Sequence, residues 1–511
     1  MLSANGANQL TLSTYSTTSR STRVRRFARP VKTTCEAMAA SGGKALSLAV
    51  VGSGVIGLSV ALGLQRAGHH VTLLDRAGGV ACPQHSTSYG HAGTFATYAN
   101  VPVNRPGIVW DLPQLLSATG PLSIKPTPHL LRMAPWFAHF LRNCNADAVE
   151  HTALSLGMLL SRAQPAYNAI WEQAAMDVDG PMGKYSTSGH GDLSFSCRQG
   201  YLILQKSAAA MAASQAGAAL RRRGVAGLRM EALSPEEVMG LEPNLVPSAA
   251  AGGAWWFPDG WFVRDPAAVL LALADGFAGA GGELRTGADG DVSSIAPGPR
   301  GDGVRLALSG GASMDADQVV VAAGAHSATL AASVGDWVPL DTERGHHVGF
   351  APGSESLLSR AVCDPSQGFV MTPMAGGMRA AGTVELGGTA SPLTEARCKQ
   401  LESASAALLR PEAVAKLGGR LPEADWVGFR PSMPDALPVL GRSTRNPQVI
   451  YAFGHQHLGW TLGGITAQIV GELVAGQEPS VPLEPFHPDR FTVMRSGSAT
   501  LASAGRVRTA S

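Results

Sequence analysis

The stretch Leu46-Ser-Leu-Ala-Val-Val-Gly-Ser-Gly-Val-Ile-Gly57 decides the fold of this chain. Residues 46–51 are apolar and strongly β-forming, which predicts a strand that runs into a glycine-rich turn. Residues 55–67 have the composition of a buried helix, and Gly68 follows as a stop signal. A second β-forming run ends at Asp75. This order of elements predicts a βαβ unit.

The spacing of the three glycines predicts a dinucleotide-binding loop. Gly52 permits the tight turn, Gly54 allows the backbone to approach a pyrophosphate, and Gly57 allows the helix and strand to pack closely. Amides at the start of the helix can then bind phosphate oxygens. We expect Asp75 to accept hydrogen bonds from the adenosine ribose, and an acid there favours FAD or NAD over NADP. The loop alone does not distinguish FAD from NAD.

A membrane span is the other interpretation of residues 46–64. This segment is uncharged and close to the ~20 residues that a bilayer requires. The glycine spacing and the β-forming start favour the βαβ unit instead, so we predict no transmembrane segment.

Composition excludes several classes of protein. The chain has 511 residues, of which 45% are hydrophobic, enough for two or three cored domains. The net charge is only +2, which disfavours nucleic acid as a partner. The six cysteines never form a C-x-x-C pair, which disfavours zinc, iron–sulfur and disulfide-scaffold proteins, and we predict no metal site. A reduced intracellular compartment fits these thiols best.

Residues 1–44 differ from the rest of the chain. They are rich in Ser and Thr, carry five arginines between positions 20 and 29, and contain Glu36 as their single acid. This composition predicts a transit peptide, with a merely disordered segment as the alternative. Because hydroxylated residues precede the arginines, we expect a chloroplast destination, with the mitochondrion as the alternative.

Three further motifs accompany the loop. They are Ser86-Thr-Ser-Tyr-Gly-His-Ala-Gly93, Val320-Val-Ala-Ala-Gly-Ala-His-Ser327, and a C-terminal series of Gly428-Phe-Arg-Pro-Ser-Met-Pro-Asp435, Pro438-Val-Leu-Gly441 and Gly454-His-Gln-His-Leu-Gly-Trp-Thr461. Together they resemble the FAD-dependent amine oxidoreductases of the D-amino-acid oxidase superfamily, most closely the D-amino-acid dehydrogenase branch. The resemblance covers nearly all of residues 46–479.

The resemblance implies an α/β fold in which a Rossmann-like FAD-binding domain is interleaved with an α+β substrate domain on a mixed or antiparallel sheet. The oxidoreductase region would span residues 45–490 and be followed by a disordered tail at 491–511. The FAD-binding segments would be about 45–100, 265–335 and 425–480, and the substrate-domain segments about 101–264 and 336–424.

The loop and the resemblance together imply a set of FAD-binding residues. They are Gly52, Ser53, Gly54, Val55, Ile56, Gly57, Asp75, Arg76, Ser86, Thr87, Ser88, His91, Ala92, Gly93, Val292, Ala323, Gly324, Gly454, Leu458, Gly459, Trp460 and Thr461. His91 stands where the dehydrogenases usually have asparagine. A covalent histidine–flavin link is an alternative there, although the spacing does not match the relatives that make one.

Two residues are predicted to be catalytic. By resemblance Arg430 binds the substrate carboxylate, and a guanidinium suits that role because it offers a planar fork of two donors. The alternative for Arg430 is a structural salt bridge. His455 is a candidate base, although a lone histidine is more often a hydrogen-bonded structural residue. The roles of six other polar residues of the substrate lobe stay open: Glu343, Arg344, His346, His347, Arg379 and Glu385.

The predicted function is oxidation of a small amino acid, a D-amino acid or related amine, to the imine or 2-oxo acid by hydride transfer to FAD. Electrons would then pass to oxygen or a quinone. One alternative is 2-hydroxy-acid oxidation, which would need a base such as His455 or His347. The other is a non-catalytic flavin-binding protein. Peripheral contact with a membrane is left open.

Overall fold

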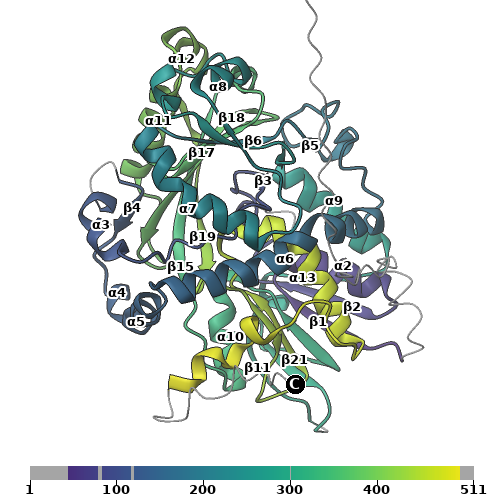
Figure 1. The fold of residues 1–511 in the computed structure, drawn as a ribbon. Helices are drawn as coiled ribbons and strands as arrows, with labels where there is room; N and C mark the ends of the chain where they lie inside the picture. Colours follow the sequence, from purple (N-terminus) through teal and green to yellow (C-terminus); the bar gives the residue numbers. More distant parts are fainter. Residues whose placement is uncertain (1–43, 79–82, 117–119, 300, 495–511) are drawn as a thin grey trace, which may run out of the picture.

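The computed structural model describes residues 44–78, 83–116, 120–299 and 301–494, which form two lobes, each built on a large sheet (Figure 1). The first sheet has six strands in the order β10-β2-β1-β14-β21-β20, and all are parallel except β20. Their bounds are β1 (Ser47–Val51), β2 (His70–Asp75), β10 (Glu283–Thr286), β14 (Gln318–Val321), β20 (Val439–Arg442) and β21 (Val449–Phe453).

Apolar helices pack beside this sheet. The helices α2 (Val55–Arg66) and α13 (Gly459–Val474) are buried along most of their length, as expected for helices whose composition is apolar on all sides. The long helix α6 (Ala146–Gln173) packs against α13 at two adjacent glycines, where the backbone of Gly464 meets that of Tyr167. Helix α9 (Pro266–Gly279) packs against α2.

The second sheet follows the order β19-β15-β18-β17-β16-β6-β8-β7, with β4 paired to β18. It is antiparallel except for the pairs β16–β6 and β18–β4, which makes it a mixed sheet. Its strands are β4 (Leu122–Ile124), β6 (Tyr201–Leu204), β7 (Glu231–Leu233), β8 (Ala254–Phe257), β15 (Asp341–Phe350), β16 (Ala361–Asp364), β17 (Phe369–Met374), β18 (Gly377–Leu386) and β19 (Arg420–Ser432). The predicted fold class is therefore confirmed.

Smaller elements complete the lobes. Two three-stranded sheets consist of β11 (Val292–Pro297), β12 (Val304–Leu308) and β13 (Ser313–Ala316), and of β3 (Thr94–Phe95), β9 (Trp261–Val263) and β5 (Ser196–Cys197). The remaining α-helices are α3 (Ile108–Leu115), α4 (His129–Arg132), α5 (Ala134–Arg142), α7 (Ala208–Gly224), α8 (Pro235–Leu241), α10 (Ser327–Val334), α11 (Glu395–Leu408) and α12 (Pro411–Leu417).

Three separate segments of the chain contribute strands to the first sheet, and they are the three segments predicted to bind FAD. β19 belongs to the second sheet although it crosses the predicted boundary at 425. The predicted transit peptide, apart from Lys44, lies outside the described residues. Residues 46–64 form β1 and most of α2. Among the described helices, none combines the length and apolarity needed to cross a bilayer.

The folded chain extends slightly further than the sequence predicts. A 3₁₀ helix, η10 (Pro488–Met494), includes Phe491, which is only 4% exposed and packs in the core of the first lobe. The predicted tail therefore begins too early at residue 491, because an aromatic side chain anchors that position. Residues 495–511 lie outside the described chain.

Candidate dinucleotide and substrate site

The glycine loop adopts a conformation that requires glycine. Gly52 has a φ of +104°, and a Cβ there would lie 2.5 Å from the carbonyl oxygen of Ala322. A Cβ on Gly57 would overlap the carbonyl oxygen of Gly52, so helix α2 could not pack against the turn. Asp75 lies at the end of β2, where its Oδ2 accepts hydrogen bonds from the amide and hydroxyl of Ser53, each at 2.7 Å. The two halves of the predicted fingerprint are thus in contact.

A cavity of about 610 Å³ extends from this loop between the two lobes. Sixteen of the predicted FAD residues line it: Gly52, Ser53, Gly54, Val55, Ile56, Asp75, Arg76, Ser86, Thr87, Ser88, His91, Val292, Ala323, Gly324, Gly459 and Trp460. Sequence analysis missed other lining residues, including Asp291, Thr329, Thr389 and Phe429. Asp291 directly precedes Val292, so its position was the one signal that could have identified it.

Six predicted FAD residues do not line the cavity in the described structure: Gly57, Ala92, Gly93, Gly454, Leu458 and Thr461. Gly454, with a φ of +82°, leaves room for Met433, and the Thr461 hydroxyl accepts a hydrogen bond from the amide of Ala96 at 2.9 Å. The Thr461 side chain, and the lack of a side chain at Gly454, therefore support the wall of the cavity from behind. Direct contact with FAD stays a prediction for these six.

Residues of the substrate lobe hold the second motif, residues 86–93, against the cavity. Arg379 on β18 donates to the carbonyl oxygen of His91 at 3.0 Å. His347 on β15 donates from Nδ1 to the carbonyl oxygen of Gly90 at 2.9 Å, and its ring stacks on Trp426. From the other lobe, the indole of Trp460 donates to the carbonyl oxygen of Ser88 at 2.7 Å. Two of the polar residues with open roles thus position the motif.

His91 uses both of its ring nitrogens. The amide of Gly93 donates to Nδ1 at 3.0 Å, so the ring proton lies on Nε2, which donates to the carbonyl oxygen of His457 at 3.1 Å. Burial, followed by the positive charges of Arg430 and Arg379, lowers the pKa of His91 to about 3. A covalent link to a flavin would require one of these hydrogen bonds to break.

Arg430 on β19 lies beside the end of the cavity, although it does not line the wall. Its charge contributes to the lowered pKa values of His91 and His457, both of which line the cavity. The guanidinium donates from Nη1 to the carbonyl oxygen of Thr383 at 2.7 Å and from Nη2 to that of Gly382 at 3.3 Å. These two bonds fix the plane of the guanidinium and leave donors for a ligand.

The neighbouring strands shape the space around this arginine. Gly345 on β15 lies under the guanidinium, and any Cβ there would overlap it. Opposite Gly345, β18 changes register, and Thr383 adopts a φ of +57° that is unusual for a residue with a side chain. The bulge turns the carbonyls toward Arg430. Burial raises the pKa of Glu343, the cross-strand partner of Arg430, and the arginine's charge opposes that rise.

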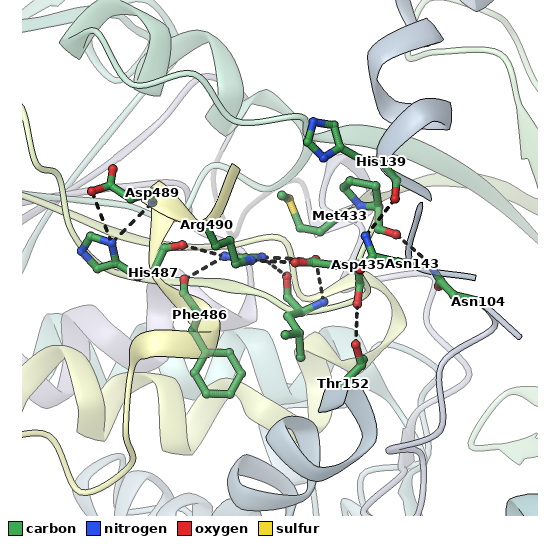
Figure 2. Close-up of polar contacts among 12 residues, drawn as sticks. Asn104, His139, Asn143, Thr152, Met433, Asp435, Phe486, His487, Asp489 and Arg490 are labelled. Carbon is green, nitrogen blue, oxygen red and sulfur yellow. Dashed lines mark hydrogen bonds and ion pairs between the residues drawn. The ribbon is translucent and has the colours of Figure 1, made fainter. Parts of the chain in front are cut away.

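A network behind the site holds the loop that follows Arg430 (Figure 2). Asp435 accepts hydrogen bonds from Nε and Nη2 of Arg490, at 2.7 and 3.3 Å, and Arg490 also donates to the carbonyl oxygen of Leu437 at 2.7 Å. Asn104 donates to the carbonyl oxygen of Pro434 at 2.6 Å. The aspartate of the arginine motif is therefore an anchor for the chain rather than part of the cavity wall.

Three histidines near the site, His346, His347 and His455, are buried, and burial is the main reason that the pKa of each falls to about 3. We refer to them as the buried histidines. His455 lines the cavity, but its Nε2 hydrogen-bonds the hydroxyl of Thr466 at 3.0 Å. These contacts favour a structural role for His455, and its role as a base stays a prediction.

Potential metal ligands converge elsewhere. Within the described ranges, Glu395, Cys398 and Asp425 bring ligand atoms within 4.8 Å of one another. Arg420 pairs with both carboxylates, at 2.7 and 3.6 Å, so a cation already occupies this cluster. The adjacent His346 and His347 make separate contacts, with Thr383 and Gly90 respectively.

The glycine loop, the acid at the end of β2 and the cavity beside them fit a dinucleotide-binding site. Residues 47–473 match the family described as FAD dependent oxidoreductase, and the chain belongs to this family. It is therefore an FAD-dependent oxidoreductase, and the predicted family and cofactor are confirmed. The shape of the site agrees, because the glycine cradle and the helix start fit a pyrophosphate and the cavity extends beyond them.

Curated relatives match over nearly their whole length. The chain is 31% identical over 456 residues to a D-amino-acid oxidase of Bradyrhizobium diazoefficiens, covering 87% of this chain and 98% of the relative. It is 29% identical to D-amino acid dehydrogenase 2 of Ralstonia nicotianae, covering 86% and 99%. Among solved structures, glycine oxidase from Geobacillus kaustophilus shares the fold, with a TM-score of 0.63, 22% identity, and coverage of 88% and 99%.

Proposed function

We propose that this enzyme oxidises a small amino acid, a D-amino acid or a related amine, to the imine, which water hydrolyses to the 2-oxo acid. The observation that carries the proposal is Arg430, a fixed guanidinium beside the end of the FAD cavity. Both curated relatives described above are named for D-amino acids, which supports the same substrate class.

The side chains around Arg430 suit a zwitterionic substrate. Unused donors of the guanidinium would bind the carboxylate in a bidentate manner. His91 and His457 line the cavity near Arg430 and are neutral, because burial lowers their pKa values to about 3 and 4. Neutral rings add no positive charge, so an amine can enter without repulsion. When bound along the glycine loop, FAD supplies the acceptor for the hydride.

The lowered pKa values favour an amine over a 2-hydroxy acid. Hydroxy-acid oxidation needs a base to remove the hydroxyl proton, and His455 and His347 are the candidates. Both are hydrogen-bonded within the protein, and their pKa values of about 3 make them weak bases. An amino acid that gives its ammonium proton to solvent as it binds can then transfer its Cα hydride without such a base, and orientation dominates catalysis.

The test is anaerobic bleaching of the bound flavin by a panel of D-amino acids, glycine, sarcosine, hydroxyproline and 2-hydroxy acids. We expect amino acids to bleach the flavin, and Arg430→Met to slow bleaching by about 100-fold or more, because a charge-assisted pair is lost. Arg445→Met, at an exposed arginine, is the matched control. Bleaching by hydroxy acids alone would refute the amine proposal. No bleaching by any small carboxylate would favour a non-catalytic flavoprotein.

Two further proposals concern the surroundings of the enzyme. The electron acceptor is oxygen or a quinone, which reoxidation of the bleached enzyme in air or with a soluble quinone distinguishes. Residues 1–44 direct the chain to the chloroplast, as their composition suggests. A fluorescent protein fused behind residues 1–44 should enter chloroplasts, and its accumulation in mitochondria or the cytosol would refute this destination.

A further inference from the structure

Exposed apolar side chains gather in one part of the chain. Ten large hydrophobic side chains are exposed among the described residues, and seven of them lie between positions 103 and 141. They are Val103, Val109, Trp110, Leu116, Ile124, Leu131 and Leu141. Single exposed apolar residues are normal on any protein, but this concentration in under a tenth of the described chain is not. Trp110, at 85% exposed, and Leu131, at 82%, are the extreme cases.

These residues belong to elements that the fold holds firmly. β4 pairs with β18, and a small core that includes Trp136 and Leu386 joins β4, α4 and α5 to that strand. The indole of Trp136 also donates to the carbonyl oxygen of Ser432, at 3.0 Å. Figure 1 shows α3, β4, α4 and α5 together along one edge of the molecule. The exposure along β4, α4 and α5 is therefore built into elements that have a separate apolar face turned inward.

Basic residues interrupt the apolar ones, and acids are scarce: Asp111 is the one acid between residues 103 and 142, and it pairs with Arg105 at 2.5 Å. No Asp or Glu occurs between residues 112 and 146, whereas Lys125, Arg132 and Arg142 do. Arg132 and Arg142 are exposed, and each directly follows an exposed leucine, Leu131 or Leu141. The chain as a whole is nearly neutral, so this excess is local. We call the exposed side chains of the described residues 103–116 and 120–142 the apolar-basic surface.

We propose that the apolar-basic surface docks the enzyme on an anionic lipid bilayer. Exposed Trp and Leu side chains enter the boundary between headgroups and acyl chains, and neighbouring arginines bind the anionic headgroups. Acids would oppose that binding, and none interrupts residues 112–146. The contact is peripheral, because no described helix can span a bilayer.

The experiment is flotation of the FAD-loaded enzyme with vesicles of phosphatidylcholine, with and without phosphatidylglycerol. We expect flotation only with the anionic vesicles and a loss in high salt. Trp110→Ser combined with Leu131→Ser should weaken vesicle binding by at least tenfold, because both side chains lose their apolar contact. Arg132→Gln combined with Arg142→Gln should weaken it by about 10- to 30-fold, since each basic residue near such a surface contributes about fivefold.

The control is Leu154→Ser combined with Leu284→Ser, two exposed leucines outside the apolar-basic surface. This variant should float like the wild type, and all variants should keep flavin bleaching by the best substrate, since none of these residues lines the cavity. Failure of the wild type to float with any vesicle would overturn the proposal. Flotation that is unchanged in both double variants of the apolar-basic surface would also overturn it. A concentration-dependent dimer that Trp110→Ser abolishes would overturn it too, because the surface would then be a contact between two copies of the chain. None of these outcomes depends on which substrate the enzyme oxidises.

Discussion

Replacing Arg490 by Met is expected to destabilise the folded enzyme by about 3–5 kcal/mol, because it leaves the carboxylate of Asp435 buried without its ionic partner. The side chains of Arg490 and Asp435 are 13% and 11% exposed. Arg490 also donates to the carbonyl oxygens of Phe486 and His487, at 2.9 and 3.1 Å, so the substitution removes the junction between residues 486–490 and the loop at 435–437.

The expected shift in melting temperature follows from the size of the folded chain. Unfolding entropy is about 2.1 cal/mol/K per residue, so the roughly 440 described residues give about 0.9 kcal/mol/K. A loss of 3–5 kcal/mol then lowers Tm by about 3–5 °C if the lobes unfold together. Differential scanning calorimetry of the FAD-loaded protein measures this shift.

A paired substitution separates the buried charge from lost packing. Asp435→Asn combined with Arg490→Met removes both charges, so we expect this double variant to be more stable than Arg490→Met alone. Arg445→Met, at an exposed position, should leave Tm unchanged within about 1 °C. A loss below about 1 °C in Arg490→Met, or a double variant that is the least stable of the set, would show that the Asp435 charge is not the source of the effect.

Four further outcomes are expected. Gly57→Ala should yield protein without bound flavin, measured by absorbance at purification, whereas Gly279→Ala, where a Cβ meets nothing within 4 Å, should retain it. Gly345→Ala should displace the Arg430 guanidinium and lower kcat/KM in the bleaching assay by about 10- to 100-fold, with flavin content unchanged. A kcat/KM equal to that of the wild type would contradict the close approach of Gly345 to Arg430. Acid should destabilise the enzyme. The buried histidines have pKa values near 3 in the folded protein and about 6.5 in the unfolded chain, so the unfolded chain binds more protons between these two pH values. The free energy of unfolding therefore falls as the pH drops below about 6.5. Urea midpoints at about pH 7.5 and 5.5 should differ in that sense, and less so in His347→Gln. Adding FAD to the apoprotein at about 100 times its Kd should stabilise it by about 2.7 kcal/mol, and an unchanged Tm would argue against binding to the native state.

Local patterns made the first βαβ unit predictable. The strand and helix around Gly52 follow from apolar runs and glycine spacing, which are properties of neighbouring residues. Helix α9 also begins at a local signal, because Asp265 at the N-cap accepts a hydrogen bond from the amide of Ala268 at 3.1 Å, and Pro266 is the first helical residue. The resemblance placed Arg430 next to the cavity, and its surroundings support that placement.

Contacts between distant residues were not predictable from such patterns. The sequence does not show that Arg379 and His347 hold residues 86–93, because those contacts join strands of one lobe to a loop of the other. Asp435 and Arg490 are 55 residues apart, and nothing in either local segment indicates the pair. The same reason explains why six predicted FAD residues lie outside the cavity wall. A motif gives the residue types, whereas the direction of each side chain depends on the folded backbone.

The interleaved first sheet has a consequence for how the enzyme is made. β1 lies in the middle of that sheet, yet its neighbour β14 begins about 270 residues later, and the next strand, β21, is close to the end of the folded chain. A growing polypeptide therefore cannot complete the sheet until almost all of it has left the ribosome, and such non-local pairing is slow. The floor of the FAD cavity includes Ala452 and Phe453 of β21. FAD can therefore bind the complete cavity only after nearly the whole chain has been synthesised and the last strands of the sheet have paired.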